Sequence, residues 1–152
     1  MSEPFYTLKN EVFANFAYYA TISTLKMMAM SLLTSRERFV KNAFANPEDI
    51  QLGRDKQAKV TLTDPDVERV RRNHLNDIEN IVPFVIIGLL YVSINPSSTT
   101  ALWHFRTFFF SRIFHTIAYQ LPLPQPSRAV GFAIGYATTM SMAIQFLRAL
   151  FK

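Results

Sequence analysis

Residues 64–83 read DPDVERVRRNHLNDIENIVP, a stretch that begins as a charged helix and ends inside an apolar one. Asp64 is a residue type that caps helices, and Pro65 suits the first helical position. A helix that continues to residue 94 has about 30 residues and is about 45 Å long, which exceeds a bilayer core by about 15 Å. Its first turns must therefore stand in water, with residues 71–79 at the membrane boundary.

Four apolar stretches carry few charges and together take up most of the 152 residues: 12–33, 78–94, 99–121 and 128–150. A transmembrane helix needs about 20 mostly apolar residues, so each stretch is a candidate span. Little chain remains for a water-soluble core. The sequence therefore predicts an all-α membrane protein, a four-transmembrane-helix bundle with up-down topology, and one integral membrane domain over residues 1–152.

Most basic residues lie in the loop 34–64 or at the start of the helix that follows it. They are Arg36, Arg38, Lys41, Arg54, Lys56, Lys59, Arg69, Arg71 and Arg72. Positive charge is retained on the cytoplasmic side of membranes, so we expect the loop to be cytosolic and both termini to be lumenal. The net charge of +5 is then a topology signal, and no nucleic-acid partner is expected. The N-terminal segment lacks the basic region of a cleaved signal peptide, which makes the first span an uncleaved anchor.

The chain contains no cysteine, which excludes disulfides and thiolate catalysis by the protein itself. Any thiol chemistry must use a thiol that the substrate brings. His74 and His115 have no third ligand spaced with them, so no metal site is predicted.

Polar residues gather at the predicted cytosolic helix ends. Arg72, Asn76 and Glu79 share one helix face, and Arg71 and His74 lie on an adjacent line. In the third stretch a polar stripe follows the helical spacing: His104, Phe108, Ser111, Arg112, His115 and Tyr119. Arginines bind carboxylates and glutamate accepts from an ammonium group, so a small peptide such as glutathione suits this set. The alternative is that the arginines are topology signals and lipid-headgroup anchors.

Lys26 and the pair Gly131 and Gly135 each have two possible interpretations. Lys26 lies within the first apolar stretch. We expect it to face the bundle interior or to extend toward the interface, in preference to contacting a ligand. Gly131 and Gly135 either allow a close helix approach or relieve crowding.

The segments FANPED, VERVRRNHLNDIENIVPF, GLLY, HFR, RIFHTIAY and PLPQPSRA occur in this order from Phe44 to Ala129. With these segments the chain resembles the MAPEG membrane superfamily, and within it the microsomal glutathione transferase branch. The prostaglandin E synthase branch shares FANPED and the ERxxRxHxND pattern but is less similar around PLPQP. It is the nearest rival.

The resemblance implies a homotrimer in the endoplasmic reticulum membrane, and also in the mitochondrial outer membrane, with glutathione held between subunits near the cytosol. The family's glutathione-binding positions match Arg38, Arg71, Arg72, His74, Asn76, Glu79, Arg112, His115 and Tyr119. Arg128 matches the arginine associated with thiol activation, Tyr119 would orient glutathione or its sulfur, and Asp49 matches an accessory acid of some members. Some members carry a reactive cysteine just after FANPED, where this chain has Ile50.

The expected activity is attack of the glutathione thiolate on hydrophobic electrophiles that enter from membrane lipids. A thiol with a pKa near ~8.5 is only a few per cent ionised at neutral pH, so a guanidinium beside the sulfur would raise the reactive fraction. Reduction of lipid hydroperoxides would use the same site. Two alternatives stay open: a glutathione-dependent prostaglandin E synthase, and a non-enzymatic lipid-binding scaffold.

Overall fold

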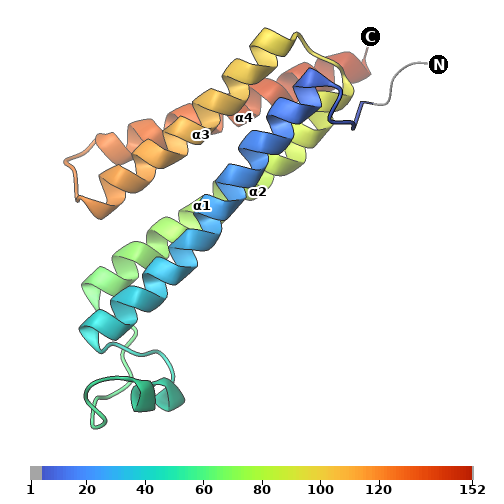
Figure 1. The fold of residues 1–152 in the computed structure, drawn as a ribbon. Helices are drawn as coiled ribbons and strands as arrows, with labels where there is room; N and C mark the ends of the chain where they lie inside the picture. Colours follow the sequence, from blue (N-terminus) through green and yellow to red (C-terminus); the bar gives the residue numbers. More distant parts are fainter. Residues whose placement is uncertain (1–4, 152) are drawn as a thin grey trace.

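The computed structural model describes residues 5–151 and contains four long α-helices, with a long loop between the first two and short turns between the others (Figure 1). In chain order the elements are α1 (Glu11–Lys41), the 3₁₀ helix η1 (Pro47–Leu52), α2 (Pro65–Ser93), α3 (Ser98–Gln120) and α4 (Ser127–Leu150). The described residues contain no β-strand. The prediction of an all-α chain is therefore confirmed for these residues.

Side-chain caps explain where the first two long helices begin. The Oδ1 atom of Asn10 accepts hydrogen bonds from the backbone N–H groups of Val12 (2.9 Å) and Phe13 (3.3 Å) at the start of α1. Asp64 Oδ1 does the same for Asp66 (3.1 Å) and Val67 (3.0 Å) at the start of α2. These bonds satisfy N–H groups that have no partner within the helix. The predicted start of α2 is confirmed.

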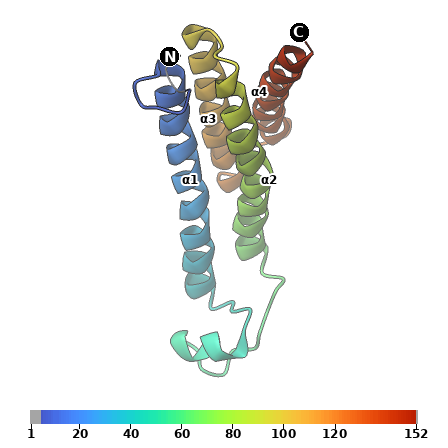
Figure 2. The ribbon, with the colours of Figure 1, turned by 90° about the vertical axis from the view of Figure 1, so that its right-hand side faces the viewer.

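The first helix is longer than the stretch 12–33 that suggested it, because α1 continues through a charged segment to Lys41. It ends where Asn42 adopts a left-handed backbone conformation with φ of 53°, which asparagine tolerates better than most residues. The connection to α2 then holds η1. Most of this loop projects beyond the ends of the two helices (Figures 1 and 2).

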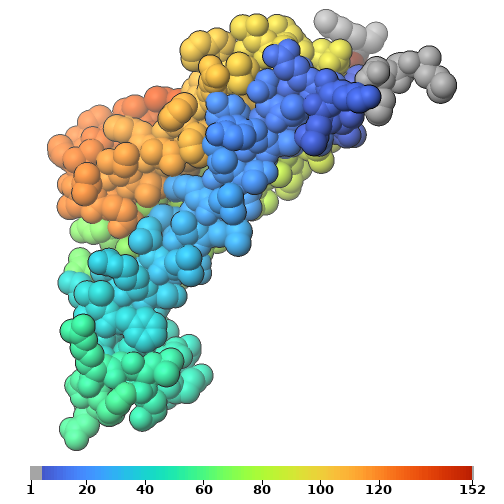
Figure 3. Space-filling view, in the orientation of Figure 1, coloured from blue at the N-terminus to red at the C-terminus, as the bar shows by residue number. Residues whose placement is uncertain are grey.

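Consecutive long helices run in opposite directions and pack as two pairs, α1 with α2 and α3 with α4 (Figure 1). Helix α3 also contacts α1 and α2, and α4 contacts α2, whereas α1 and α4 do not touch within the described residues. The pairs meet near the turn between α2 and α3 and diverge toward their other ends. In the space-filling view the α1–α2 loop and the α3–α4 turn form two separate projections (Figure 3).

Aromatic side chains fill the core where the two helix pairs meet. The rings of Phe84 and Phe108 stack, with their centroids 3.8 Å apart and their planes inclined by 2°. The ring centroids of Phe16 and Phe105 are 5.6 Å apart. A Cβ atom added to Gly88 would lie 2.4 Å from the ring of Phe16. Glycine at this position therefore lets α1 pack closely against α2.

Two helices, α2 and α4, are long and apolar enough to cross a membrane. Helices α1 and α3 are also long, but neither contains so continuous an apolar segment. Large apolar side chains are nevertheless exposed on them, including Leu32 of α1 at 74% and Trp103 of α3 at 63%. Exposed apolar surface of this extent is typical of contact with lipid or with another subunit.

Candidate functional site

A buried ion cluster joins α1, α2 and α3 just below the aromatic core. The Asp77 carboxylate is fully buried, and Arg112 is only 1% exposed. Arg112 Nη2 donates a hydrogen bond to Asp77 Oδ1 at 2.9 Å, and Lys26 Nζ donates to Asp77 Oδ2. Burying these charges is tolerable because each cation has a carboxylate oxygen as its partner.

Two of the predicted site residues complete this cluster around Arg112. Its Nη2 atom also lies 2.7 Å from the Asn76 side-chain oxygen and 3.2 Å from His115 Nδ1. Arginine can only donate, so His115 Nδ1 accepts in this geometry. The structure therefore brings together Asn76, Arg112 and His115, which the sequence had suggested from separate helices.

Glycines on α4 allow this helix to pack directly against the segment of α3 that carries Arg112 and His115. A Cβ atom on Gly131 would lie 3.1 Å from the Cα and Cβ atoms of His115. A Cβ atom on Gly135 would lie 2.8 Å from Ser111 Oγ and 3.5 Å from Arg112 Cδ. Both glycines thus permit a close helix approach, which decides between the two interpretations of this pair.

A second group of predicted residues lies at the α3–α4 turn. The Arg128 guanidinium sits over the Tyr119 ring, 4.9 Å from its centroid. With its amide oxygen turned toward this arginine, Gln125 accepts from Nε at 3.3 Å and Nη2 at 2.9 Å. The Tyr119 ring also lies 5.6 Å from the His115 ring, which links the turn to the buried cluster.

The remaining predicted binding residues lie on α1, on α2 and in the loop between them. Arg38 Nη1 donates to the Ala43 carbonyl at 3.1 Å, which helps to close the end of α1. Arg71 Nε donates to Glu68 at 2.9 Å and 3.1 Å, and this carboxylate raises the pKa of Arg71 above its already high ordinary value. Arg72 is exposed and makes no side-chain ion pair within the described residues.

Three other predicted residues face different surroundings. His74 is half-buried and lines an apolar groove with Leu25 and Leu32 of α1. Glu79 is exposed beside a groove between α2 and α4. Asp49 lies in η1, where it accepts from Asn46 Nδ2 at 3.0 Å. The grooves that His74 and Glu79 line contain neither Arg128 nor Tyr119.

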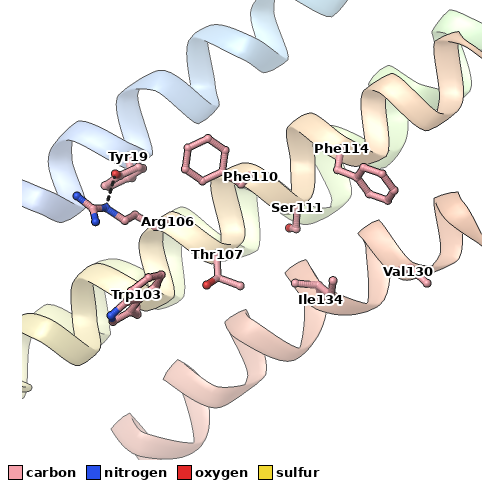
Figure 4. Close-up of a pocket in the computed structure, with 9 residues that line it drawn as sticks. All are labelled: Tyr19, Trp103, Arg106, Thr107, Phe110, Ser111, Phe114, Val130 and Ile134. Atoms are coloured by element: carbon pink, nitrogen blue, oxygen red, sulfur yellow. Dashed lines mark hydrogen bonds between the residues drawn. The ribbon is translucent and has the colours of Figure 1, made fainter.

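A groove of about 640 Å³ lies elsewhere, between α1, α3 and α4 (Figure 4). Its walls are mostly apolar, and its main polar feature is a hydrogen bond of 3.0 Å from Arg106 Nε to the Tyr19 hydroxyl. None of the predicted glutathione-binding residues lines it. Within residues 5–151 no three His, Asp or Glu side chains gather as metal ligands.

Sequence reasoning missed Asp77, although the residue lies in the stretch that decided the fold. The expected polar face of α2 was Arg72, Asn76 and Glu79, whereas the structure buries Asn73, Asp77 and Asn80. The two sets have the same spacing and differ by one position. Lys26 and Arg112 were the available signal, since two cations in apolar stretches need an anion. The prediction that Lys26 faces the interior is confirmed.

Comparison with known proteins places these features in a family. The model of the MAPEG family matches residues 16–148. The chain is 55% identical to microsomal glutathione S-transferase 1 of Sus scrofa over 93% of this chain and 92% of that protein. It is 54% identical to the protein of that name from Homo sapiens, with the same coverage. It is 36% identical to prostaglandin E synthase of Bos taurus over 92% of this chain and 90% of that protein. The chain therefore belongs to the MAPEG family.

Proposed function

We propose that this protein is a membrane-bound glutathione transferase that joins the glutathione sulfur to hydrophobic electrophiles. The observation that carries this proposal is the identity of 54–55%, over 93% of the chain, with relatives named microsomal glutathione S-transferase 1. The buried, cation-rich cluster around Arg112 supports it, because glutathione is an anion with two carboxylates. Glutathione is then a co-substrate, and no metal takes part.

The cationic and amide side chains of α2 and α3 would hold the peptide. Arginines supply paired N–H donors to carboxylates, and Glu79 would accept from the ammonium group. The full set comprises Arg38, Arg71, Arg72, His74, Asn76, Glu79, Arg112, His115 and Tyr119, with Asp49 as a possible accessory acid. Arg112 is the central member of this set, because its buried guanidinium has N–H donors without a hydrogen-bond partner among the described residues.

Arg128 would favour the thiolate of bound glutathione. A positive charge beside the sulfur stabilises the anion, and each unit by which the thiol pKa falls corresponds to about 1.4 kcal/mol. The thiol proton passes to solvent, the sulfur electron pair forms the new C–S bond, and the leaving group departs with its bonding pair. Tyr119 holds the guanidinium from below through its ring face.

The assembly we propose is a homotrimer in which all four long helices of each subunit cross the membrane. We propose that this membrane is that of the endoplasmic reticulum, with a second location in the mitochondrial outer membrane. The loop 34–64 would face the cytosol. The divergent helix pairs support this arrangement, because residues on α1 and α2 that lie apart from Arg128 within one chain could meet the Arg128 of another chain. Light scattering of the purified protein tests the trimer, and protease accessibility of the loop in sealed microsomes tests its side.

The deciding experiment gives purified protein glutathione together with an activated aryl halide, a lipid hydroperoxide or a prostaglandin endoperoxide in separate assays. The proposal expects conjugation of the aryl halide, with hydroperoxide reduction as a second activity. Calorimetry should detect glutathione binding in the same preparation. A preparation that binds no glutathione would favour a lipid-binding scaffold instead.

Glutathione-dependent prostaglandin E synthesis is the second candidate. Relatives named prostaglandin E synthase are 36–38% identical to this chain over 87–92% of its length. This similarity supports prostaglandin E synthesis as an alternative activity. The lower identity ranks it second. Rapid endoperoxide isomerisation without aryl-halide conjugation would reverse this order.

A further inference from the structure

The buried ion cluster contains two cations and one carboxylate. Asp77 of α2 bonds to both Lys26 of α1 and Arg112 of α3, and the Lys26 side chain is only 12% exposed. No acidic residue follows Glu79 in the sequence, so α3 and α4 supply no further carboxylate. The cluster therefore keeps a net positive charge in a place where solvent screens charge poorly.

The contacts of Arg112 are gathered on one of its three nitrogens. Asp77, Asn76 and His115 all lie around Nη2, at 2.9, 2.7 and 3.2 Å. The buried Nε and Nη1 atoms have no partner among residues 5–151. A buried donor without a partner destabilises the folded state, and the penalty is larger when the group is charged. Free donors and uncompensated charge together point to an anionic acceptor that arrives from outside the chain.

We propose that Asp77 is a positioning residue of the glutathione site and that Lys26 sets the charge of that site. This inference rests on the proposed function. Asp77 holds Nη2, which fixes the guanidinium and leaves its other donors in place for a carboxylate of glutathione. Lys26 neutralises Asp77, so Arg112 presents its full charge to the ligand. Neither Asp77 nor Lys26 needs to touch glutathione.

A purely structural ion cluster would behave differently. Loss of Asp77 would then lower thermal stability and the amount of active protein without a selective effect on glutathione. A positioning role instead raises the Kd and the KM for glutathione, while kcat at saturating glutathione changes little, because thiol activation belongs to Arg128. The two roles are therefore separated by a KM-against-kcat comparison.

The test uses purified full-length protein in detergent, with glutathione titrated by calorimetry and conjugation followed over a range of glutathione concentrations. Asp77→Asn keeps the size and one acceptor oxygen but removes the charge. We expect it to raise the Kd for glutathione about tenfold with kcat within about twofold, and Asp77→Glu to restore part of the affinity. Asp66→Asn makes the same chemical change at the exposed start of α2 and should leave the Kd unchanged.

A double-mutant cycle with Arg112→Gln shows whether Asp77 acts through Arg112. The proposal expects Asp77→Asn to cause no further loss of affinity in the Arg112→Gln background. An equal loss in both backgrounds, or wild-type affinity in Asp77→Asn alone, would overturn it.

Lys26→Met gives an independent answer if the Asp77 variants fail to fold. This change keeps the bond between Asp77 and Arg112 but lowers the cluster charge by one. We expect the Kd for glutathione to rise about threefold, and an unchanged Kd would reject the proposal. Should wild-type protein itself bind no glutathione, the proposed function fails as well, so the two failures are distinguishable.

Discussion

The guanidinium of Arg128, in the first turn of α4, lies over the ring of Tyr119, in the last turn of α3. The turn between the two helices brings them together, and Gln125 within that turn supplies an oxygen to the same guanidinium. A cation over an aromatic face is stabilised by about 0.5–2 kcal/mol, depending on how far it is desolvated. Arg128 is thus held by two contacts from its own chain before any ligand binds.

Replacing Arg128 with leucine should abolish the ultraviolet absorbance of the glutathione thiolate in the bound complex. The leucine side chain carries no charge to stabilise the anion, so the thiol returns toward its ordinary pKa of ~8.5. Glutathione affinity should stay within a few-fold, because the arginines that we propose for carboxylate binding lie on other helices. Difference spectroscopy and calorimetry measure the two quantities. Normal thiolate formation in this variant would remove Arg128 from the mechanism.

Two variants of Tyr119 separate the ring from its hydroxyl group. Tyr119→Leu removes the ring that supports Arg128. If the bound thiolate loses about 1 kcal/mol of stabilisation as a result, the thiolate-to-thiol ratio falls about fivefold. Tyr119→Phe keeps the ring and should retain most of the thiolate. The same spectroscopic assay applies to both. A large loss of thiolate absorbance in Tyr119→Phe would instead show that the Tyr119 hydroxyl group stabilises the thiolate by acting on the sulfur.

Gly131→Leu should destabilise the protein by about 1–3 kcal/mol, as overpacking of well-packed interiors does. The new side chain would begin 3.1 Å from backbone and side-chain atoms of His115, and backbone cannot move aside easily. Thermal unfolding in detergent would report this as a lower Tm. Ala133→Leu adds comparable bulk on an exposed face of the same helix and serves as its control. Equal Tm values for the two variants would contradict the close packing of α3 and α4.

Asp64→Ala should unravel the first turn of α2. The lost cap costs about 1 kcal/mol, since the N–H groups of Asp66 and Val67 lose their acceptor. Hydrogen exchange of these two amides should become faster, with the rest of α2 unaffected. Asparagine caps as well as aspartate, so Asp64→Asn should exchange like the wild type. Unchanged exchange in Asp64→Ala would show that the cap is dispensable.

The ends of α1 and α2 are joined by an ion pair of 2.5 Å between Lys41 Nζ and Asp66 Oδ2. The hydrogen bond and charge of Lys41 lower the pKa of Asp66 from its ordinary 3.8, and Asp66 raises the pKa of Lys41 above 10.5. The pair therefore contributes stability above the ordinary pKa of the acid, and this is lost as pH falls through the lowered value. At the basic end the contribution is lost as pH rises through the raised pKa of Lys41.

Carboxyl-carbon NMR of Asp66 checks this pH dependence. Lys41→Met should return the Asp66 pKa toward its ordinary value, and added salt should do so in part because both groups are exposed. An identical titration curve in the variant would mean that the pair does not form in solution.

The sequence predicted helix α2 best, because its signals are local. A capping aspartate followed by proline determines where a helix begins whatever surrounds it, and α2 begins at Pro65 as expected. The end of α1 was predicted less well. The stretch 12–33 marked only the apolar part of the helix. The helical backbone continues to Lys41 through polar residues that could equally well form an exposed loop.

The buried face of α2 depended on tertiary packing and so could not be predicted from spacing alone. Asn76 and Asp77 are neighbours in sequence, and one-residue spacing moves a side chain by about 100° around the helix. The direction that became interior was set by Lys26 and Arg112 on other helices.

All eleven acidic residues precede α3, and both protein partners of the Asp77 carboxylate are cations. Synthesis proceeds from the N-terminus, so the segments that carry Lys26 and Asp77 leave the ribosome before the segment that carries Arg112. The first half of the chain thus supplies the carboxylate that Arg112 contacts. A fragment that starts at α3 would keep Arg112 but lose every acidic residue of the protein.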